Sequence, residues 1–208
     1  MSETGKDYHF FAMMDRMRLI KRWSLMRNHS SENLAEHALM VALVAHAMAI
    51  LRNANVVGGP EAPKVDAERV AVMGLYHDAP EIITGDLPTP VKYYDDSIRE
   101  AYRRVEESAL ERLLSFLPDF MVPEYRGLMS ESDNDEKAVE ERQFVRAADK
   151  ICAYLKCAQE VRSGNGEFAL ALRQSEQRVR RMGLPEADYF MRHFADSFSL
   201  TLDELNPT

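Results

Sequence analysis

The chain has 208 residues, of which 46% are hydrophobic and 29% are charged. This length and composition fit a single globular domain with one sizeable core and exclude a disordered chain. With 34 acidic against 26 basic side chains, the formal net charge is −8, which argues against nonspecific binding to a nucleic acid polymer or an anionic membrane. A small anionic ligand is still compatible with this charge, because salt screens distant charges beyond about 8 Å.

The first residues, MSETGKDYHFF, contain no basic segment followed by an apolar one, so we expect no signal peptide and a cytoplasmic protein. The longest apolar stretch, residues 39–51, is well short of the about 20 residues that cross a bilayer, and we interpret it as part of a buried helix. Cys152 and Cys157 match neither CxxC nor a zinc-ribbon spacing and are expected to be reduced core thiols.

Apolar residues recur at helical spacing along most of the chain, and no alternating stretch of strand length stands out, which predicts an all-α fold. The first predicted helix has its apolar members within residues 10–23. Asn33, with Glu36 three residues later, has the capping-box pattern and predicts a second helix through about Arg52. Residues 53–64, NANVVGGPEAPK, contain glycines and prolines that predict an exposed loop.

Asp66 is placed to cap a third helix that leads directly into His77-Asp78. Pro80 has no backbone N–H and disfavours helical geometry at the residue before it, so this helix should end or kink just after the pair. Neighbouring residues on a regular helix point about 100° apart, so a helix end makes it easier for both side chains to reach one ion. The Gly- and Pro-rich residues 85–90 predict a loop beside them.

The rest of the chain predicts further helices separated by short breaks. The expected segments are a long amphipathic helix over about 97–116, a looser acidic connection over 118–134, a helix over about 135–162, and shorter helices over about 167–182 and 185–194. The sequence contains no internal repeat, so these helices are expected to form one domain.

Two imidazoles and two carboxylates from separate segments, His37, His77-Asp78 and Asp149, give the strongest functional signal. Such a mixed nitrogen and oxygen set suits Mn, Fe, Co, Ni, Zn or Mg better than a thiolate site would. Asp149 lies in an apolar stretch, where a buried carboxylate is costly unless it is paired or binds an ion. A lone histidine in an apolar helix is usually a core residue, and Arg146 offers Asp149 a salt bridge instead, so spacing alone leaves both interpretations open.

The pattern His…His-Asp…Asp in an all-helical chain resembles the HD-domain metal-dependent phosphohydrolases. The flanking motifs narrow the resemblance to the bacterial YfbR-type 5'-deoxynucleotidases: RWSLMRN at 22–28, SENLAEHAL at 31–39, YHDAPEIITGDLPTPVKYY at 76–94 and ADKICAYLKC at 148–157. The likeness runs in order from about His9 to Leu205. It implies one HD domain over residues 1–208, an all-α helical bundle whose site comes from about residues 18–40, 76–92 and 146–150.

By this resemblance, the four residues His37, His77, Asp78 and Asp149 are ligands of one divalent metal ion such as Co or Mn. The implied reaction is hydrolysis of deoxyribonucleoside 5'-monophosphates to deoxyribonucleosides and phosphate by a metal-bound water, with selectivity against ribonucleotides. The implied partners are a small-molecule nucleotide substrate and a second copy of the chain in a homodimer, with no nucleic acid polymer and no membrane.

The resemblance also gives catalytic roles to Glu81, Asp86 and Arg22. It implies substrate contacts for Arg22, Trp23, Asp86, Leu87, Pro88 and Thr89. The chemistry of these residues agrees: the Arg22 guanidinium matches a phosphate bidentately, and Trp23 offers a rigid wall against a ribose 2'-hydroxyl.

Two carboxylates beside the HD pair are suited to proton chemistry. Glu81 follows His77 by four residues and can return to the same side to hold or deprotonate the water. Asp86 is suited either to accept a hydrogen bond from a sugar 3'-hydroxyl or to pass a proton to the leaving oxygen, and the sequence does not choose between these roles. Pro80 stands where the family more usually has a small polar residue, which puts the placement of Glu81 in doubt.

Two alternative functions remain open from the sequence. One is HD-type hydrolysis of another nucleotide or of a phosphodiester, and the other is a catalytically silent nucleotide or metal sensor. Glu81 and Asp86 argue against a sensor, which would not need both. No Ser or Cys nucleophile stands in a recognisable activating motif, so we expect no covalent intermediate.

Overall fold

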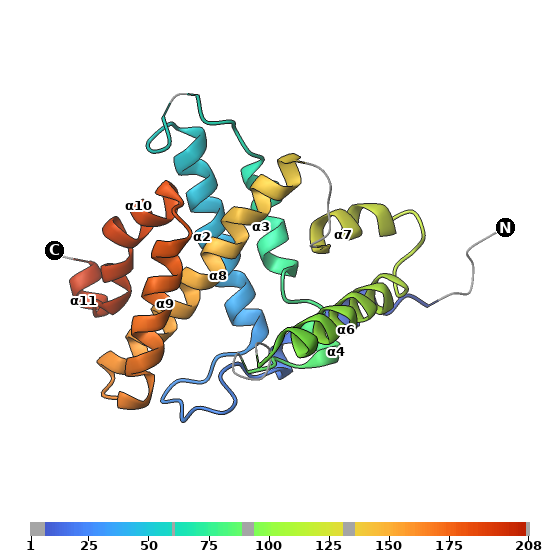
Figure 1. Cartoon of the computed structure of the whole chain (residues 1–208), viewed down its shortest axis with the longest axis horizontal. Coiled ribbons are helices and arrows are strands. Elements are labelled where there is room, and N and C mark those ends of the chain that lie inside the picture. The colour runs from blue at the N-terminus through green and yellow to red at the C-terminus, as the bar shows by residue number, and fades with distance from the viewer. Residues whose placement is uncertain (1–6, 60, 89–93, 131–135, 207–208) are drawn as a thin grey trace.

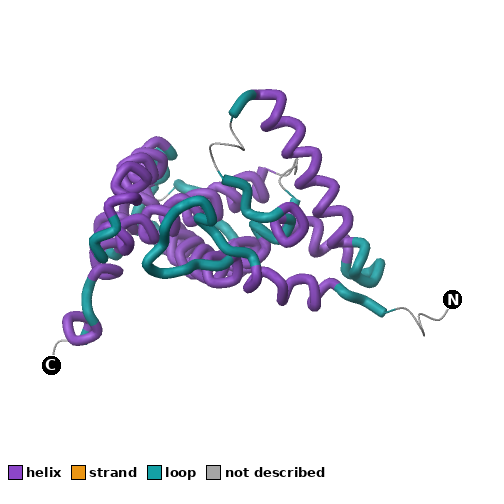
Figure 2. The backbone as a smooth tube through the Cα atoms, turned by 90° about the horizontal axis from the view of Figure 1, so that it is seen from below, coloured by secondary structure: helices purple, strands orange, loops and turns teal. Residues whose placement is uncertain are grey.

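The computed structural model describes residues 7–59, 61–88, 94–130 and 136–206. Within these ranges it contains helices and no strand, which confirms the predicted all-α class (Figures 1 and 2). Along the chain the elements are α1 (Phe10–Met14), η1 (Asp15–Leu19), α2 (Leu34–Asn53), α3 (Ala67–Tyr76), α4 (Glu81–Thr84), α6 (Asp96–Leu114), α7 (Val122–Met129), α8 (Glu136–Arg162), η2 (Gly166–Phe168), α9 (Ala169–Arg181), α10 (Pro185–His193), η3 (Ala195–Ser199) and α11 (Leu202–Leu205), where η marks a 3-10 helix.

The centre of the molecule is formed by α2, α3 and α8, which pack against one another (Figure 1). Helices α9 and α10 lie on one side of this centre, and α6 and α7 lie on the other. The main core is built from aliphatic and aromatic side chains of all three central helices, among them Val41, Met48, Val70, Phe144 and Ile151. Cys152 and Cys157 are buried free thiols, as predicted.

Gly74 allows α3 to approach α2 closely. A Cβ atom added at Gly74 would lie 2.8 Å from Ala42 Cα and 3.0 Å from Ala42 N, so any larger residue would push the two helices apart. His37 lies on α2 and His77 directly follows α3. The spacing of these helices therefore sets the distance between the two imidazoles.

The start of α2 is fixed by the predicted capping box. The Asn33 side chain accepts a hydrogen bond from Glu36 N at 3.0 Å, and the Glu36 carboxylate accepts one from Asn33 N at 3.1 Å. The backbone N–H of Leu34 also donates to Ile20 O at 3.0 Å, which ties the helix start to the segment after η1. These contacts place His37 in the first turn of the helix.

The predicted break after the third helix is present, but it comes two residues early, before His77-Asp78 rather than just after the pair. Asp66 caps the helix by accepting a hydrogen bond from Arg69 N at 2.9 Å, and the helix ends at Tyr76. The next residues form tight turns, with the N–H of Glu81 donating to Asp78 O at 3.0 Å, before α4 begins after Pro80. His77 and Asp78 therefore lie outside regular helix, which frees their side chains to converge.

Three expectations about the helices need correction. The first helix does not extend to Trp23. Helical structure ends with η1 at Leu19, and Ile20 already has an extended backbone. The apolar residues that follow, including Trp23, lie in a loop. The segment 118–134 is not all loose, since α7 lies within it with a proline in its first turn, where the missing N–H is tolerated. The last of its residues, 131–134, lie outside the described ranges.

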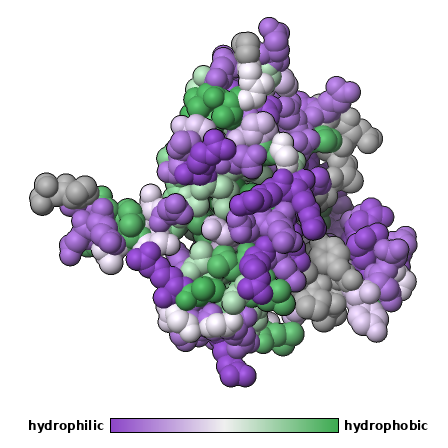
Figure 3. Space-filling view, turned by 60° about the vertical axis from the view of Figure 1, so that its left-hand side comes forward, coloured by the Kyte–Doolittle hydropathy of each residue, from purple (hydrophilic) through white to green (hydrophobic). Residues whose placement is uncertain are grey.

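The third correction concerns α2, which was expected to be a buried helix but is exposed on one side. By length and composition this helix is apolar enough to cross a membrane, but half of the window is buried inside the molecule against α3 and α8. On its other side Leu39, Leu43 and Ile50 are 53%, 56% and 46% exposed. Elsewhere apolar and polar side chains are mixed on the surface, as Figure 3 shows for one face.

Candidate active site

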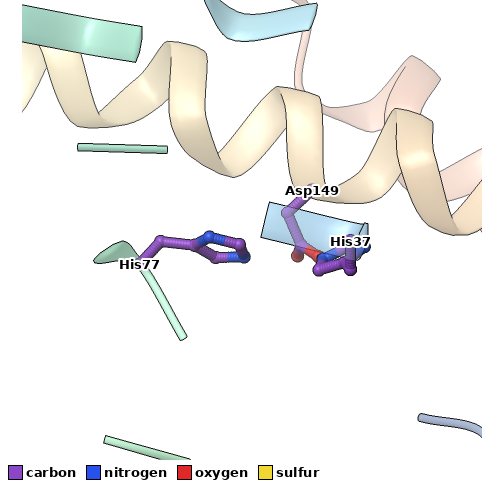
Figure 4. Close-up of side chains that lie close together, drawn as sticks. All are labelled: His37, His77 and Asp149. Atoms are coloured by element: carbon purple, nitrogen blue, oxygen red, sulfur yellow. The ribbon is translucent and has the colours of Figure 1, made fainter. Parts of the chain in front are cut away.

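The structure brings the four predicted metal ligands together from three elements. One ligand atom each from His37, His77 and Asp149 lies within 4.8 Å of the others, and Figure 4 shows the His77 ring directed toward His37 and Asp149. His37 Nε2 is 3.2 Å from Asp149 Oδ1. Asp78 Oδ2 lies 3.1 Å from His77 Nε2 and 3.7 Å from His37 Nε2. Ligands at about 2.1 Å from one ion lie up to about 4.2 Å apart, so little adjustment is needed.

The hydrogen bonding of His77 fits a metal ligand. Its Nδ1 lies 2.8 Å from Gly74 O, and because a carbonyl only accepts, Nδ1 must carry the proton. When the ring is neutral, as a metal ligand must be, the lone pair is on Nε2, which is buried and lies 3.1 Å from Asp78 Oδ2 without a hydrogen-bond partner. A buried imidazole nitrogen facing carboxylates, with its other nitrogen held by a backbone carbonyl, is the arrangement that a divalent ion satisfies.

The pKa shifts of His77 and Asp149 reflect the carboxylates that are gathered in the cluster. Burial opposes the charge on His77, yet the neighbouring carboxylates, Asp78 above all, raise its pKa to about 9. Burial likewise opposes ionisation of Asp149, but its hydrogen bond with His37 holds its pKa at about 2. Two carboxylates at this point favour positive charge, whether it is supplied by protons or by a metal ion.

Arg22 lies directly beside this cluster. Its Nη1 donates to Asp78 Oδ2 at 3.1 Å and its Nε donates to Glu32 Oε2 at 3.2 Å. The side chain is only 11% exposed; burial opposes its charge, but Asp78 and the other nearby carboxylates raise its pKa above the usual value. A fixed, buried guanidinium next to a metal site is suited to hold a phosphate group.

Trp23 is held in an unusual backbone conformation, with φ at +57°. The left-handed region is unfavourable for a bulky residue, and here it is stabilised by contacts on both ends of the residue. The backbone N–H donates to Asp86 Oδ2 at 3.2 Å, and the indole Nε1 donates to Glu32 Oε2 at 3.0 Å. The indole also packs against Phe168, with ring centroids 5.5 Å apart.

The loop after α4 meets Trp23 through Asp86. Gly85, with φ at +75°, supplies the turn into this loop. Burial raises the pKa of Asp86 more than the Arg22 charge lowers it, so this carboxyl is a better proton carrier than a solvated aspartate. Leu87 and Pro88 lie in the same loop, as predicted, whereas the predicted contact residue Thr89 lies outside the described ranges.

Residue spacing in the sequence left open where Pro80 places Glu81 and which residue pairs with Asp149. Glu81 is buried at the first position of α4, and its backbone N–H donates to Asp78 O at 3.0 Å, so the backbone at Glu81 stays next to the pair after Pro80. Asp149 Oδ1 accepts a hydrogen bond from His37 Nε2 at 3.2 Å.

A groove of about 590 Å³ lies between the segment that bears Arg22 and Trp23, the Asp86 loop and α9. From the predicted segments it is lined by Arg22, Trp23, Ser24, Leu25, Met26, Asp86, Leu87 and Pro88, and from the C-terminal half by Ala153, Glu167, Leu170, Ala171, Gln174, Ser175 and Arg178. Its size is in the range of small-molecule sites. The α9 wall was not predicted as part of the site, because only the tertiary packing shows that it reaches this groove. Glu32 was not predicted either, and it joins the site through its contacts with Arg22 and Trp23.

Solved structures with similar architecture include HD-domain phosphohydrolases. One is from Listeria innocua, with a TM-score of 0.75 and 22% identity over 91% of this chain and 88% of that chain. Another is the DatZ phosphohydrolase of cyanophage S-2L, bound to dA and one catalytic zinc ion, with a TM-score of 0.58 and 22% identity over 97% and 99% of the two chains. The fold is therefore the all-helical HD-domain fold.

The family is shown by the sequence comparisons. The model of the YfbR-like 5'-deoxynucleotidases matches residues 9–198. A 5'-deoxynucleotidase of Vibrio vulnificus strain YJ016 is 47% identical over 97% of this chain and its own full length, and one of Pectobacterium atrosepticum is 45% identical over 95% of this chain and 96% of its own. The chain belongs to the YfbR-like 5'-deoxynucleotidase family.

Proposed function

We propose that this enzyme is a metal-dependent 5'-deoxynucleotidase that releases phosphate from deoxyribonucleoside 5'-monophosphates and disfavours ribonucleotides. The observation that carries the proposal is the convergence of His37, His77, Asp78 and Asp149 directly beside the buried Arg22 guanidinium. Family membership at 45–47% identity to 5'-deoxynucleotidases agrees with this assignment.

The four clustered residues would hold one divalent ion. When bound, such an ion polarises a water molecule and neutralises phosphate charge. The donor set, two imidazoles and two carboxylates with no thiolate, suits Co or Mn, and we propose one of these as the working ion. Zinc, as in the DatZ structure, is the main competitor.

The remaining side chains have separate tasks in the proposed reaction. Arg22 exchanges its contact with Asp78 for the phosphate and orients it. Glu81 holds the attacking water and accepts its proton, and the water attacks phosphorus directly without a covalent enzyme intermediate. Asp86 contacts the sugar 3'-hydroxyl or protonates the leaving 5'-oxygen, for which a raised pKa is favourable.

Deoxy selectivity is assigned to Trp23 together with Asp86. The link between Trp23 N and Asp86 Oδ2 holds the loop beside the indole, so a sugar in this part of the groove contacts both residues. An indole packed against C2' leaves a ribose 2'-hydroxyl without room or hydrogen-bond partners. The base would extend toward Leu170 and Gln174 of α9, where the groove is open, and we expect weak base preference.

Phosphate release from chelator-stripped protein tests the proposed function. Deoxy- and ribonucleoside monophosphates, with a diester as a further substrate, are each assayed with Co, Mn, Mg and Zn added singly. We expect metal-dependent release that is faster from the deoxynucleotides. Release from the diester alone, or no metal-dependent release from any deoxynucleotide, would reject the proposal.

We also propose that the enzyme works as a cytoplasmic homodimer. Leu39, Leu43 and Ile50 follow helical spacing on one face of α2, and an exposed apolar stripe of this kind is suited to pair with a second copy. Two buried reduced thiols agree with a reducing compartment. Light scattering should give a dimeric mass for the wild type and a smaller mass for Leu43→Glu; a monomeric wild type would contradict the dimer.

A further inference from the structure

Glu32 makes contact with both substrate-facing side chains of the N-terminal loop. A single carboxylate oxygen, Oε2, accepts hydrogen bonds from Arg22 Nε at 3.2 Å and from Trp23 Nε1 at 3.0 Å. The side chain is only 17% exposed, so these bonds are partly shielded from solvent. Hydrogen bonds to an ionised carboxylate in such a setting are stronger than those between neutral groups.

The backbone holds Glu32 opposite Arg22. The N–H of Arg22 donates to Glu32 O at 3.0 Å, and Lys21 forms an antiparallel bridge with Asn33. The two ends of the loop are therefore joined at the start of α2. The Glu32 side chain reaches Arg22 and Trp23 from a backbone position that is itself fixed.

The other carboxylate oxygen faces the metal cluster. Glu32 Oε1 lies 3.9 Å from His37 Nδ1, which is buried and has no hydrogen-bond partner. This distance is too long for a hydrogen bond, so Glu32 places a negative charge beside the cluster without a direct bond to His37.

We propose that Glu32 is a positioning residue that holds the Arg22 guanidinium and the Trp23 indole in fixed positions relative to the metal cluster. When Arg22 turns its terminal nitrogens to a phosphate, the Nε bond to Glu32 preserves the plane of the guanidinium. The same oxygen fixes the indole, which sets the distance between the phosphate and the sugar wall. The inference rests on the proposed function, since Glu32 would position two side chains that are proposed to bind the substrate.

The test compares Glu32→Ala and Glu32→Gln with the wild type. Trp23 is the only tryptophan, so the fluorescence of the metal-free protein reports directly on its surroundings. Kinetics with dAMP and AMP, with metal restored, report on the site. The matched control is Glu68→Gln, which removes the charge of an exposed carboxylate in the first turn of α3.

We expect Glu32→Ala to change the Trp23 emission, to increase its quenching by acrylamide and to lower the dAMP-to-AMP ratio of kcat/KM about tenfold, the effect of losing a charged hydrogen bond. Glu32→Gln keeps an acceptor for the indole but loses the charge facing Arg22. It should therefore retain near-normal emission while KM for dAMP rises. Glu68→Gln should match the wild type in both measurements.

Normal emission and a normal dAMP-to-AMP ratio in a folded Glu32→Ala protein would overturn the proposal. If circular dichroism shows that this variant is unfolded, Glu32→Gln decides, because an unchanged KM for dAMP would equally overturn it. Failure of the proposed function would be seen differently, as absence of phosphate release by the wild type. In that case the metal-free fluorescence still decides whether Glu32 positions Trp23.

Discussion

Trp23 carries a strained backbone conformation that its neighbours stabilise. Asp86 accepts its backbone N–H and Glu32 accepts its indole N–H, while Phe168 packs against the ring. Residue type suggested a wall at this position, but the sequence could not show the left-handed φ, because nothing in the local pattern requires it. The same holds for Glu32, whose role depends on contacts that only the fold creates.

Replacing Trp23 with leucine should narrow the preference for deoxynucleotides. A smaller side chain leaves space for a 2'-hydroxyl, so the dAMP-to-AMP ratio of kcat/KM should fall by about tenfold, mainly through improved use of AMP. Parallel steady-state assays of both substrates measure this ratio. An unchanged ratio would remove Trp23 from the selectivity mechanism.

Replacing Glu81 with glutamine should lower kcat for dAMP by at least about 100-fold, because loss of a general base commonly costs this much. The bound metal, measured by elemental analysis, should stay near the wild-type amount, since Glu81 is not among the four proposed ligands. Glu68→Gln, an exposed change in the first turn of α3, is the control. Full activity of Glu81→Gln would show that another group accepts the proton.

At the scale of elements, α8 supports the site at two points. Near its middle it carries Asp149, and three turns later Glu160 anchors the loop that bears Arg22 and Trp23. The buried Glu160 carboxylate accepts hydrogen bonds from His29 N at 2.9 Å, Ser30 N at 3.0 Å, Asn165 Nδ2 at 2.7 Å and Lys156 Nζ at 2.5 Å.

This anchor should make stability depend on pH. Burial opposes ionisation of Glu160, but its ion pair with Lys156 and its other hydrogen bonds hold its pKa at about 2, below the value of an unfolded glutamate. Its contribution, about 3 kcal/mol, is therefore complete above about pH 4.5 and is lost as the pH falls toward 2. Urea unfolding at pH 3 and pH 6 should show a smaller pH effect in Glu160→Gln than in the wild type. Equal pH effects in the two proteins would contradict this assignment.

The contact of α2 with α3 gives a second prediction. Gly74→Ala should destabilise the fold by about 2 kcal/mol, because the added methyl group collides with Ala42, and it should weaken metal binding by moving His77 away from His37. Urea unfolding and metal titration measure the two effects. Gly166→Ala, where an added Cβ meets nothing within 4 Å, is the matched control, and equal behaviour of both variants would contradict the close-packing argument.

Element boundaries were predictable where a local chemical cue marks them. The Asn33–Glu36 capping box and the Asp66 cap act within one helical turn, and both are confirmed. The break near Pro80 is also present, although α3 ends two residues earlier than predicted. Apolar spacing alone was misleading at Trp23, where side chains pack from a loop at intervals that resemble a helix. Helix α7 was missed because the segment that contains it was interpreted as a loose acidic connection.

For the molecule as a whole, α2, the end of α3 and α8 each contribute to one cluster (Figure 4). The residue types of that cluster were evident from the sequence, and the motif resemblance put them in one site. The groove wall formed by α9 was not evident, since its lining residues carry no motif and contact the site only through the packing of α9 against α8.

A metal ion that joins three elements should stabilise the folded chain. An ion present at 100 times its dissociation constant adds about 2.7 kcal/mol, so chelation should lower the Tm by several degrees and restoring Co or Mn should reverse the change. Differential scanning calorimetry measures both steps. Asp149→Asn should lose most of this response, and a metal-dependent rise in Tm of wild-type size in that variant would place the ion elsewhere.

The most direct test of the central claim is a crystal structure of Glu81→Ala with cobalt and dAMP, using anomalous scattering to locate the metal. The account predicts one ion bound by His37, His77, Asp78 and Asp149, with the phosphate on Arg22 and the sugar against Trp23. An ion bound outside these four residues, or a nucleotide phosphate bound away from Arg22, would contradict it.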